Sequence, residues 1–173
     1  MRKVTLGLAN SLDNYIARKD GGSDWLYWDE EIARISATFM KTVDAILIGR
    51  KTYEVMLGFG QTAYPGAKNY VFSRKIKKSP DKKVEIVSVD AAKFVKAMKR
   101  KKGKGICLFG GGKLAMSLFN ADLIDEIVLN IHPVLLGSGI PLFHKMDRQI
   151  DLELLDSQTN KRGNLIVSYR VKH

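Results

Sequence analysis

Two short, wholly apolar segments that end in glycine constrain the fold of this chain more than any other feature. Residues 45–48 read Ala-Ile-Leu-Ile and stop at Gly49, and residues 105–109 read Gly-Ile-Cys-Leu-Phe and run into the glycines 110–112. A run of this length without a polar position is typical of a strand buried on both faces. A pattern with helical spacing follows each one. We therefore expect a largely parallel sheet that helices cover on both sides.

Other segments fit the same arrangement. Further strands are expected at 4–9, 69–73, 84–87 and 123–131, and helices at 29–43, 94–98 and 114–119. Near the end, 152–154 and 165–171 alternate apolar and polar residues around a turn-forming segment, which is typical of an antiparallel hairpin. The predicted fold class is α/β: a three-layer αβα arrangement with a mainly parallel sheet and a C-terminal antiparallel hairpin. No repeat or linker divides residues 1–173, so we expect a single domain.

The net charge of +11 raises the question of a polyanionic partner. Nearly all of the excess lies between Arg74 and Lys104, where 13 basic residues accompany three acidic ones. RNA-binding modules usually place aromatic residues among the basic ones. Phe94 is the one aromatic residue of this region, and it belongs to a helical pattern of apolar residues. The basic region is therefore interpreted as a solvated surface, with nucleic-acid binding kept as an alternative.

The cysteine content and the hydropathy of the chain indicate where the protein is expected to reside. Cys107 is the one cysteine, so no internal disulfide is expected, and its apolar neighbours predict a small buried side chain. No cluster of Cys and His predicts a metal site. No apolar run approaches the roughly 18–20 residues of a membrane span, and the stretch after Met1 stops at Asn10, too early for a secretory signal. A soluble, cytoplasmic protein is expected.

Three strand ends carry groups that can bind anions. They are Gly110-Gly111-Gly112-Lys113, Gly49-Arg50-Lys51-Thr52 and Ser73-Arg74. Glycine lets the backbone approach a ligand closely, a helix N-terminus offers unpaired N–H groups, and Arg or Lys adds positive charge. Neither the G-x-G-x-x-G fingerprint nor the G-x-x-x-x-G-K-[ST] loop is present. Tight turns and ordinary helix starts are the alternatives, but three such ends on one parallel sheet indicate a ligand with several phosphates, such as a dinucleotide.

The order of these segments resembles the dihydrofolate reductase fold. The likeness runs over nearly the whole chain, from the strand that ends at Ala9, through 48–54 and 68–73, to 109–112. Two segments narrow it to the branch typified by the reductase domain of bifunctional riboflavin-biosynthesis proteins. They are 10–17, N-S-L-D-N-Y-I-A, and the more specific 132–143, H-P-V-L-L-G-S-G-I-P-L-F.

This resemblance implies an enzyme, an NADPH-dependent oxidoreductase that acts on a small molecule. In the branch, the ribose ring of a phosphorylated ribosylamino-pyrimidine is reduced to a ribityl chain. The chain has no H-x-E and no C-x-x-C, so it lacks the zinc deaminase half that accompanies the reductase in bifunctional members. A dihydrofolate or pterin reductase is the nearest alternative. A nucleotide-binding or basic-patch nucleic-acid-binding protein without turnover is the alternative of another class. The resemblance also implies a homodimer.

The resemblance assigns cofactor contacts residue by residue. Arg50, Lys51 and Thr52, beside Gly49, would hold phosphates, whereas Ser73 and Arg74 would face the 2′-phosphate and favour NADPH over NADH. The pyrophosphate would lie along Gly110, Gly111, Gly112, Lys113 and Leu114. Ala9 and Ile16 would contact the nicotinamide end.

The catalytic and substrate contacts are less determined. Dihydrofolate reductases carry a carboxylate a few residues after a tryptophan, and counting from Trp25 leads to Glu30, with the adjacent Asp29 equally eligible. Both could instead be ordinary acids at a helix start. Asp13, Trp25 and Trp28 are candidate substrate contacts, although the tryptophans could also cover the sheet or join subunits. His132 and His144 are candidate acid–base groups, but their neighbours Pro133 and Phe143 favour packing roles instead.

Overall fold

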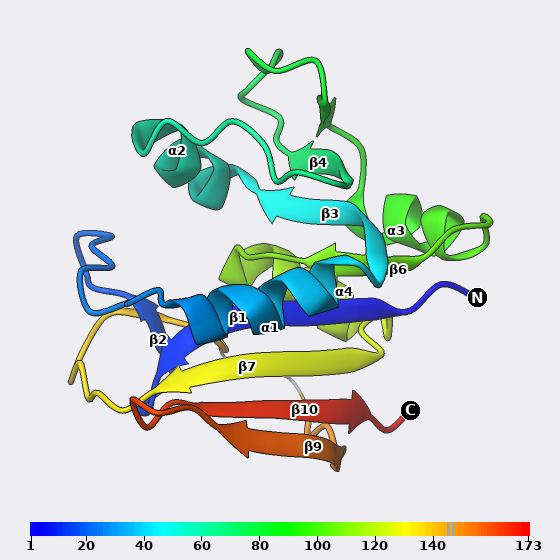
Figure 1. Cartoon of the computed structure of the whole chain (residues 1–173). Helices are drawn as coiled ribbons and strands as arrows, with labels where there is room; N and C mark the ends of the chain where they lie inside the picture. The colour runs from blue at the N-terminus through cyan, green and yellow to red at the C-terminus, as the bar shows by residue number, and fades with distance from the viewer. Residues whose placement is uncertain (145, 147) are drawn as a thin grey trace.

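An eight-stranded sheet runs through the protein in the computed structural model, which describes residues 1–144, 146 and 148–173 (Figure 1). The strands are, in order across the sheet, β5 (Val84–Val87), β4 (Lys68–Phe72), β3 (Val43–Gly49), β6 (Gly105–Leu108), β1 (Val4–Ser11), β7 (Glu126–His132), β10 (Leu165–Val171) and β9 (Leu152–Thr159). The first six are parallel, and β10 is antiparallel to both β7 and β9. The predicted sheet with its C-terminal hairpin is thus confirmed.

Helices cover both faces of this sheet. They are α1 (Glu30–Met40), α2 (Arg50–Gly58), α3 (Ala91–Lys99) and α4 (Gly112–Asn120). Apolar side chains of α1 and α2 pack on one face around Ile46 and Ile48, and those of α3 and α4 pack on the other around Leu6 and Leu108. Figure 1 shows α1 in front of the sheet with α3 and α4 behind it. The arrangement has the predicted three layers.

Two details differ from the expectations. The helical spacing predicted that α1 would reach residue 43, but the helix ends at Met40, and the buried, β-branched Val43 begins β3 instead. A small antiparallel pair, β2 (Tyr15–Ala17) with β8 (Ile140–Pro141), was not foreseen. This pair joins 10–17 to 132–143, the two segments on which the resemblance depends.

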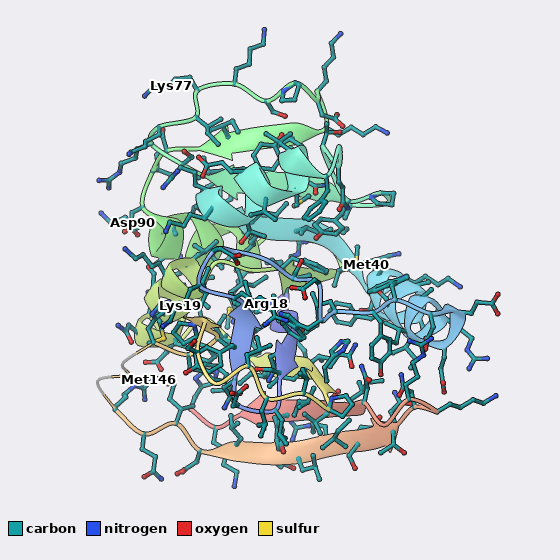
Figure 2. All side chains as sticks on the ribbon, turned by 90° about the vertical axis from the view of Figure 1, so that its left-hand side faces the viewer. Arg18, Lys19, Met40, Lys77, Asp90 and Met146 are labelled. Carbon is teal, nitrogen blue, oxygen red and sulfur yellow. The ribbon has the colours of Figure 1, made fainter. Side chains whose placement is uncertain are left out.

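The basic region lies at one margin of the molecule. It spans the loop after β4, the edge strand β5, α3 and the loop that precedes β6. In Figure 2, Lys77 projects from the far end of the molecule, well away from Arg18 near the centre. Lys99 is the exception to the predicted solvated surface: it is buried and its Nζ donates to the Leu123 carbonyl at 3.1 Å and to Asp125.

Burial agrees with the expectation for Cys107. Cys107 is a free, fully buried cysteine, and burial raises the pKa of its thiol to about 12, so the group stays neutral. Within the described part of the chain, no helix has the length and apolar character to cross a membrane. The same residues contain no group of three or more His, Cys, Asp and Glu side chains that could hold a metal ion.

Candidate active site

A cleft of about 800 Å³ opens at the carboxyl ends of the parallel strands. Its walls come from the ends of β1, β3, β6 and β7, from α1, and from the starts of α2 and α4. Figure 2 looks onto this end of the sheet. Open α/β sheets bind their ligands beyond the carboxyl ends of the strands, so this cleft is the candidate active site.

The tips of β3 and β6 touch through glycine. The Gly49 N–H donates to the Gly110 carbonyl at 3.0 Å, and a Cβ at Gly49 would lie 3.2 Å from both that oxygen and the Cα of Gly111. Gly110 and Gly111 have φ values of +124° and +99°, which L side chains rarely adopt. At Gly112, a Cβ would meet the His144 ring at 2.6 Å. These glycines therefore permit the close packing of the two strand ends, and of His144 against the start of α4.

The two helices that begin at this contact lack side-chain caps. The N-cap residues of α2 and α4 are Gly49 and Gly111, and neither makes a side-chain capping hydrogen bond. By contrast, Asp29 caps α1 and Asp90 caps α3. The first N–H groups of a helix have no partner within it. At the cleft no capping side chain takes any of these donors, whereas Asp29 and Asp90 each take one at the other two helices.

Positive charge surrounds the uncapped helix starts. Arg50, Lys51, Thr52 and Lys113, for which phosphate contacts are predicted, all line the cleft. Lys51 and Lys113 are exposed at its rim. The Arg50 guanidinium donates to both carboxylate oxygens of Glu54, at 2.6 and 2.8 Å, which holds it along α2. Ala9, Ile16 and Leu114, the other predicted contacts on these elements, also line the cleft.

Ser73 and Arg74 are not among the residues that line the cleft, although the preceding Phe72 is. Ser73 is buried, and its Oγ accepts hydrogen bonds from the N–H groups of Lys75 and Ile76 at 3.1 and 2.9 Å. Its hydroxyl therefore shapes the turn after β4. Arg74 is exposed beside this strand end. A contact of either residue with a 2′-phosphate stays a prediction.

Asp29 and Glu30 are not brought into the cleft. The Asp29 carboxylate accepts from the Ile32 N–H at 2.9 Å as the cap of α1, and lies 3.8 Å from Arg162. Glu30 is exposed at the start of the helix. The face that α1 turns to the cleft instead carries Ile32. The acids thus have the helix-start positions that were their alternative interpretation, and their catalytic role stays a prediction that this geometry does not support.

Of the three predicted substrate contacts, one lines the cleft and two do not. Trp28 lines the cleft. Asp13 does not: its carboxylate accepts from Ser11 Oγ at 2.6 Å and from the Gly137 N–H at 2.7 Å, and the Ser11 hydroxyl holds its pKa below the usual range. Asp13 therefore ties 10–17 to 132–143. Trp25 lies behind the cleft wall, edge-on to the His132 ring with centroids 5.4 Å apart.

Asn130, on β7, is a site residue that sequence reasoning missed. Asn130 and His132 line the cleft, and so does Tyr27, whose ring centroid is 4.8 Å from that of His132. His132 is 1% exposed, and burial lowers its pKa, so the imidazole is neutral at pH 7. His132 had been expected to pack, and it does so at the cleft. The available signal was alternation: polar residues at every second position of an otherwise apolar strand face something other than a core.

Comparison with protein families matches residues 2–166 to the model described as the RibD C-terminal domain. Among curated proteins, the chain is 37% identical over 155 residues to the uncharacterized protein YwjB of Bacillus subtilis (strain 168), with 88% of this chain and 89% of YwjB covered.

Solved structures show the same architecture. A structure from Shewanella sp. PV-4, whose name assigns it provisionally to riboflavin biosynthesis, superposes with a TM-score of 0.86 at 26% identity, with both chains fully covered. The Thermotoga maritima diaminohydroxyphosphoribosylaminopyrimidine deaminase/5-amino-6-(5-phosphoribosylamino)uracil reductase gives 0.74 at 15% identity, over 99% of this chain and 57% of that one. Enterococcus faecalis dihydrofolate reductase, solved with NADP(H) and RAB-propyl, gives 0.70 at 15% identity, over 99% and 97%. The fold is therefore dihydrofolate-reductase-like.

Proposed function

The chain belongs to the RibD C-terminal domain family, and from this premise we propose that it is an NADPH-dependent reductase that transfers a hydride to a small heterocyclic or ribosylamino-pyrimidine substrate. Reductases of the riboflavin and folate type share its fold. A reduced nicotinamide, when bound, supplies the hydride, so the protein's own task is to bind, orient and exclude water.

The observation that carries this proposal is the pair of uncapped helix starts at the glycine contact. Free N–H groups and the positive ends of two helix dipoles attract phosphate. A Cβ at Gly49 would lie 3.2 Å from the Gly111 Cα, so the two glycines let these helix starts lie side by side at the cleft. Lys51 and Lys113 add charge at the rim. A dinucleotide whose pyrophosphate crosses this contact would satisfy these donors.

The remaining proposed cofactor contacts come from the resemblance to the dihydrofolate reductase fold. Ala9 and Ile16, at the other end of the cleft, would hold the nicotinamide ring against β1, and Arg74 would contact the 2′-phosphate from the end of β4. Folate or pterin reduction receives less support, because no Asp or Glu is found among the described residues that line the cleft. We propose that the proton accompanying the hydride comes from water.

A single domain, a homodimer and a cytoplasmic location complete the proposal. The homodimer is supported by the edge strand β9, whose residues are all exposed and include Leu152, Leu154 and Leu155. An unprotected edge with apolar side chains is a surface on which a second chain can pair.

Thermal unfolding with NADPH tests the reductase proposal. NADPH at about a hundred times its Kd should stabilise the protein by about 2.7 kcal/mol. The double variant Lys51→Ala/Lys113→Ala should raise the Kd about tenfold or more, since two charge-assisted phosphate contacts are lost. The control Lys77→Ala/Lys78→Ala removes the same charge from the basic region and should bind normally. No stabilisation of the wild type at millimolar NADPH would refute the proposal.

A further inference from the structure

The cleft has two chemically different halves. The phosphate half is the glycine contact with the starts of α2 and α4. The apolar half lies between α1 and α2, and is lined by Trp28, Ile32, Ile35, Phe39, Val55 and Phe59. Ile32, Ile35 and Phe39 recur at helical spacing on α1, so that helix turns an apolar stripe toward the cleft. Trp28 precedes α1, Val55 lies on α2, and Phe59 is the C-cap of α2.

Part of the apolar half is open to water. Trp28 is 68% exposed, Val55 46% and Phe59 78%. A single exposed apolar side chain is ordinary, but several that line one cleft mark a binding surface. A ligand between α1 and α2 would cover them and remove apolar area from water.

The apolar half offers no counter-charge. Of the described residues that line the cleft, none is acidic, and the Lys and Arg side chains are Arg50, Lys51 and Lys113 at the helix starts. Arg34 is on α1 but is exposed and does not line the cleft. With the helix-start cations holding cofactor phosphates, a phosphate of the substrate would lie against hydrocarbon, and burying an unpaired charge is costly.

Besides these cations, the cleft offers polar groups on β7 and just before α1. Asn130 accepts at Oδ1 from Asn164 at 2.8 Å, and its Nδ2 lies 3.5 Å from His132 Nε2. His132 Nδ1 and the Tyr27 hydroxyl are buried without a hydrogen-bond partner. Unpaired buried groups of this kind favour a ligand that brings a donor or acceptor.

We propose that the substrate is an uncharged, flat, mostly apolar heterocycle without a phosphate, whose ring packs between α1 and α2 and whose hydrogen-bonding edge faces Asn130 and His132. This inference rests on the proposed reductase function. For a cyclic imine, the hydride from NADPH adds to the carbon of the C=N bond and the nitrogen takes a proton from water, which gives the amine and NADP⁺.

The test compares substrates that differ in the phosphate group with one that differs in the ring system. NADPH oxidation is measured with 5-amino-6-ribosylaminouracil, with its 5′-phosphate, and with the bicyclic imine 3,4-dihydroisoquinoline at pH 8. We expect the imine to be reduced. We also expect kcat/KM to be no higher for the 5′-phosphate than for the phosphate-free ribosylaminouracil. A higher kcat/KM for the 5′-phosphate, or no binding of either uncharged compound while NADPH still binds, would overturn the inference and leave the reductase proposal standing.

Binding is followed without turnover by the fluorescence of Trp28 in a Trp25→Phe background. Failure of NADPH to bind would refute the reductase proposal, whereas quenching by the imine alone reports on the apolar half. Because the two ligands are titrated separately, the two failures are distinguishable.

Variants that place a cation in the apolar half should reverse the preference. Ile35→Arg should weaken imine binding at least tenfold and raise kcat/KM for the 5′-phosphate over its phosphate-free partner. Thr38→Arg adds the same charge to α1 outside the cleft and is the matched control. Val55→Lys, at an exposed position of α2, gives a second test should Ile35→Arg fail to fold. An unchanged preference in folded Val55→Lys would count against the inference.

Discussion

Gly111, at the start of α4, faces Gly49, at the end of β3, so closely that a Cβ on Gly111 would lie 3.1 Å from the Gly49 Cα. Because Gly111 also has a φ of +99°, Gly111→Ala is unfavourable by both space and backbone conformation. We expect this variant to lose about 1–2 kcal/mol of stability and to raise the Kd for NADPH at least tenfold, as measured by urea unfolding and equilibrium titration.

The matched control is Gly58→Ala, at the other end of α2, where a Cβ would meet nothing within 4 Å and φ is ordinary. It should bind NADPH as the wild type does. Normal affinity in folded Gly111→Ala would show that the dinucleotide does not cross the glycine contact.

Arg74 and Ser73 should have separable roles at the end of β4. Arg74→Ala removes an exposed cation, so we expect the Kd for NADPH to rise about tenfold and that for NADH to stay unchanged. Ser73→Ala removes the hydroxyl that accepts two backbone N–H groups, so it should cost about 1 kcal/mol of stability without changing the NADPH to NADH ratio. Titration with both cofactors checks this, and a ratio that shifts only in Ser73→Ala would reverse the assignment.

Burial of His132 makes stability depend on pH. Its pKa is lowered in the folded state, so below the ordinary value of about 6.5 the unfolded chain binds the proton first. The contribution is present above that pH and is lost as pH falls toward the folded pKa, with a slope of at most about 1.4 kcal/mol per pH unit.

Urea unfolding at pH 7.5 and 5.5 measures this dependence. His132→Gln keeps a neutral polar group and should lose less stability than the wild type over that interval. His144→Gln is the control. An identical pH dependence in His132→Gln and the wild type would contradict the expectation.

The apolar edge strand β9 makes the proposed homodimer testable. Leu154→Glu places a charge at a 55% exposed position of this strand, and should convert the dimer to monomer in light scattering. Val89→Glu, an equally apolar and exposed position beyond β5 at the opposite margin, is the control. A wild-type protein that is monomeric at micromolar concentration would remove the dimer from the proposal.

Most of the glycine contact, with the helix starts and cations around it, could be predicted because its signals are local. A buried strand that ends in glycine, followed by cations and a helix, specifies both the turn and the chemistry within a few residues, as at 48–52 and 108–113. The side chains of Ser73 and Asp13 were harder to assign. A hydroxyl or carboxylate next to a turn can serve the backbone or a ligand with the same local sequence, and the hydrogen bonds that decide between these come in part from residues distant in the chain.

The sequence by itself determined the layered sheet, the order of its elements and the glycine-ended strands, because these follow from short-range periodicity and backbone conformation. Tertiary structure alone decided which face of α1 meets the cleft. That orientation brings Ile32 into the cleft and leaves Glu30 in water. Tertiary structure also sets Tyr27, in the segment before α1, against His132 across about a hundred residues of sequence. The physical reason is that a helix stripe specifies only that one side is apolar. The packing of α1 over the sheet decides how much of that stripe becomes core and how much lines the cleft.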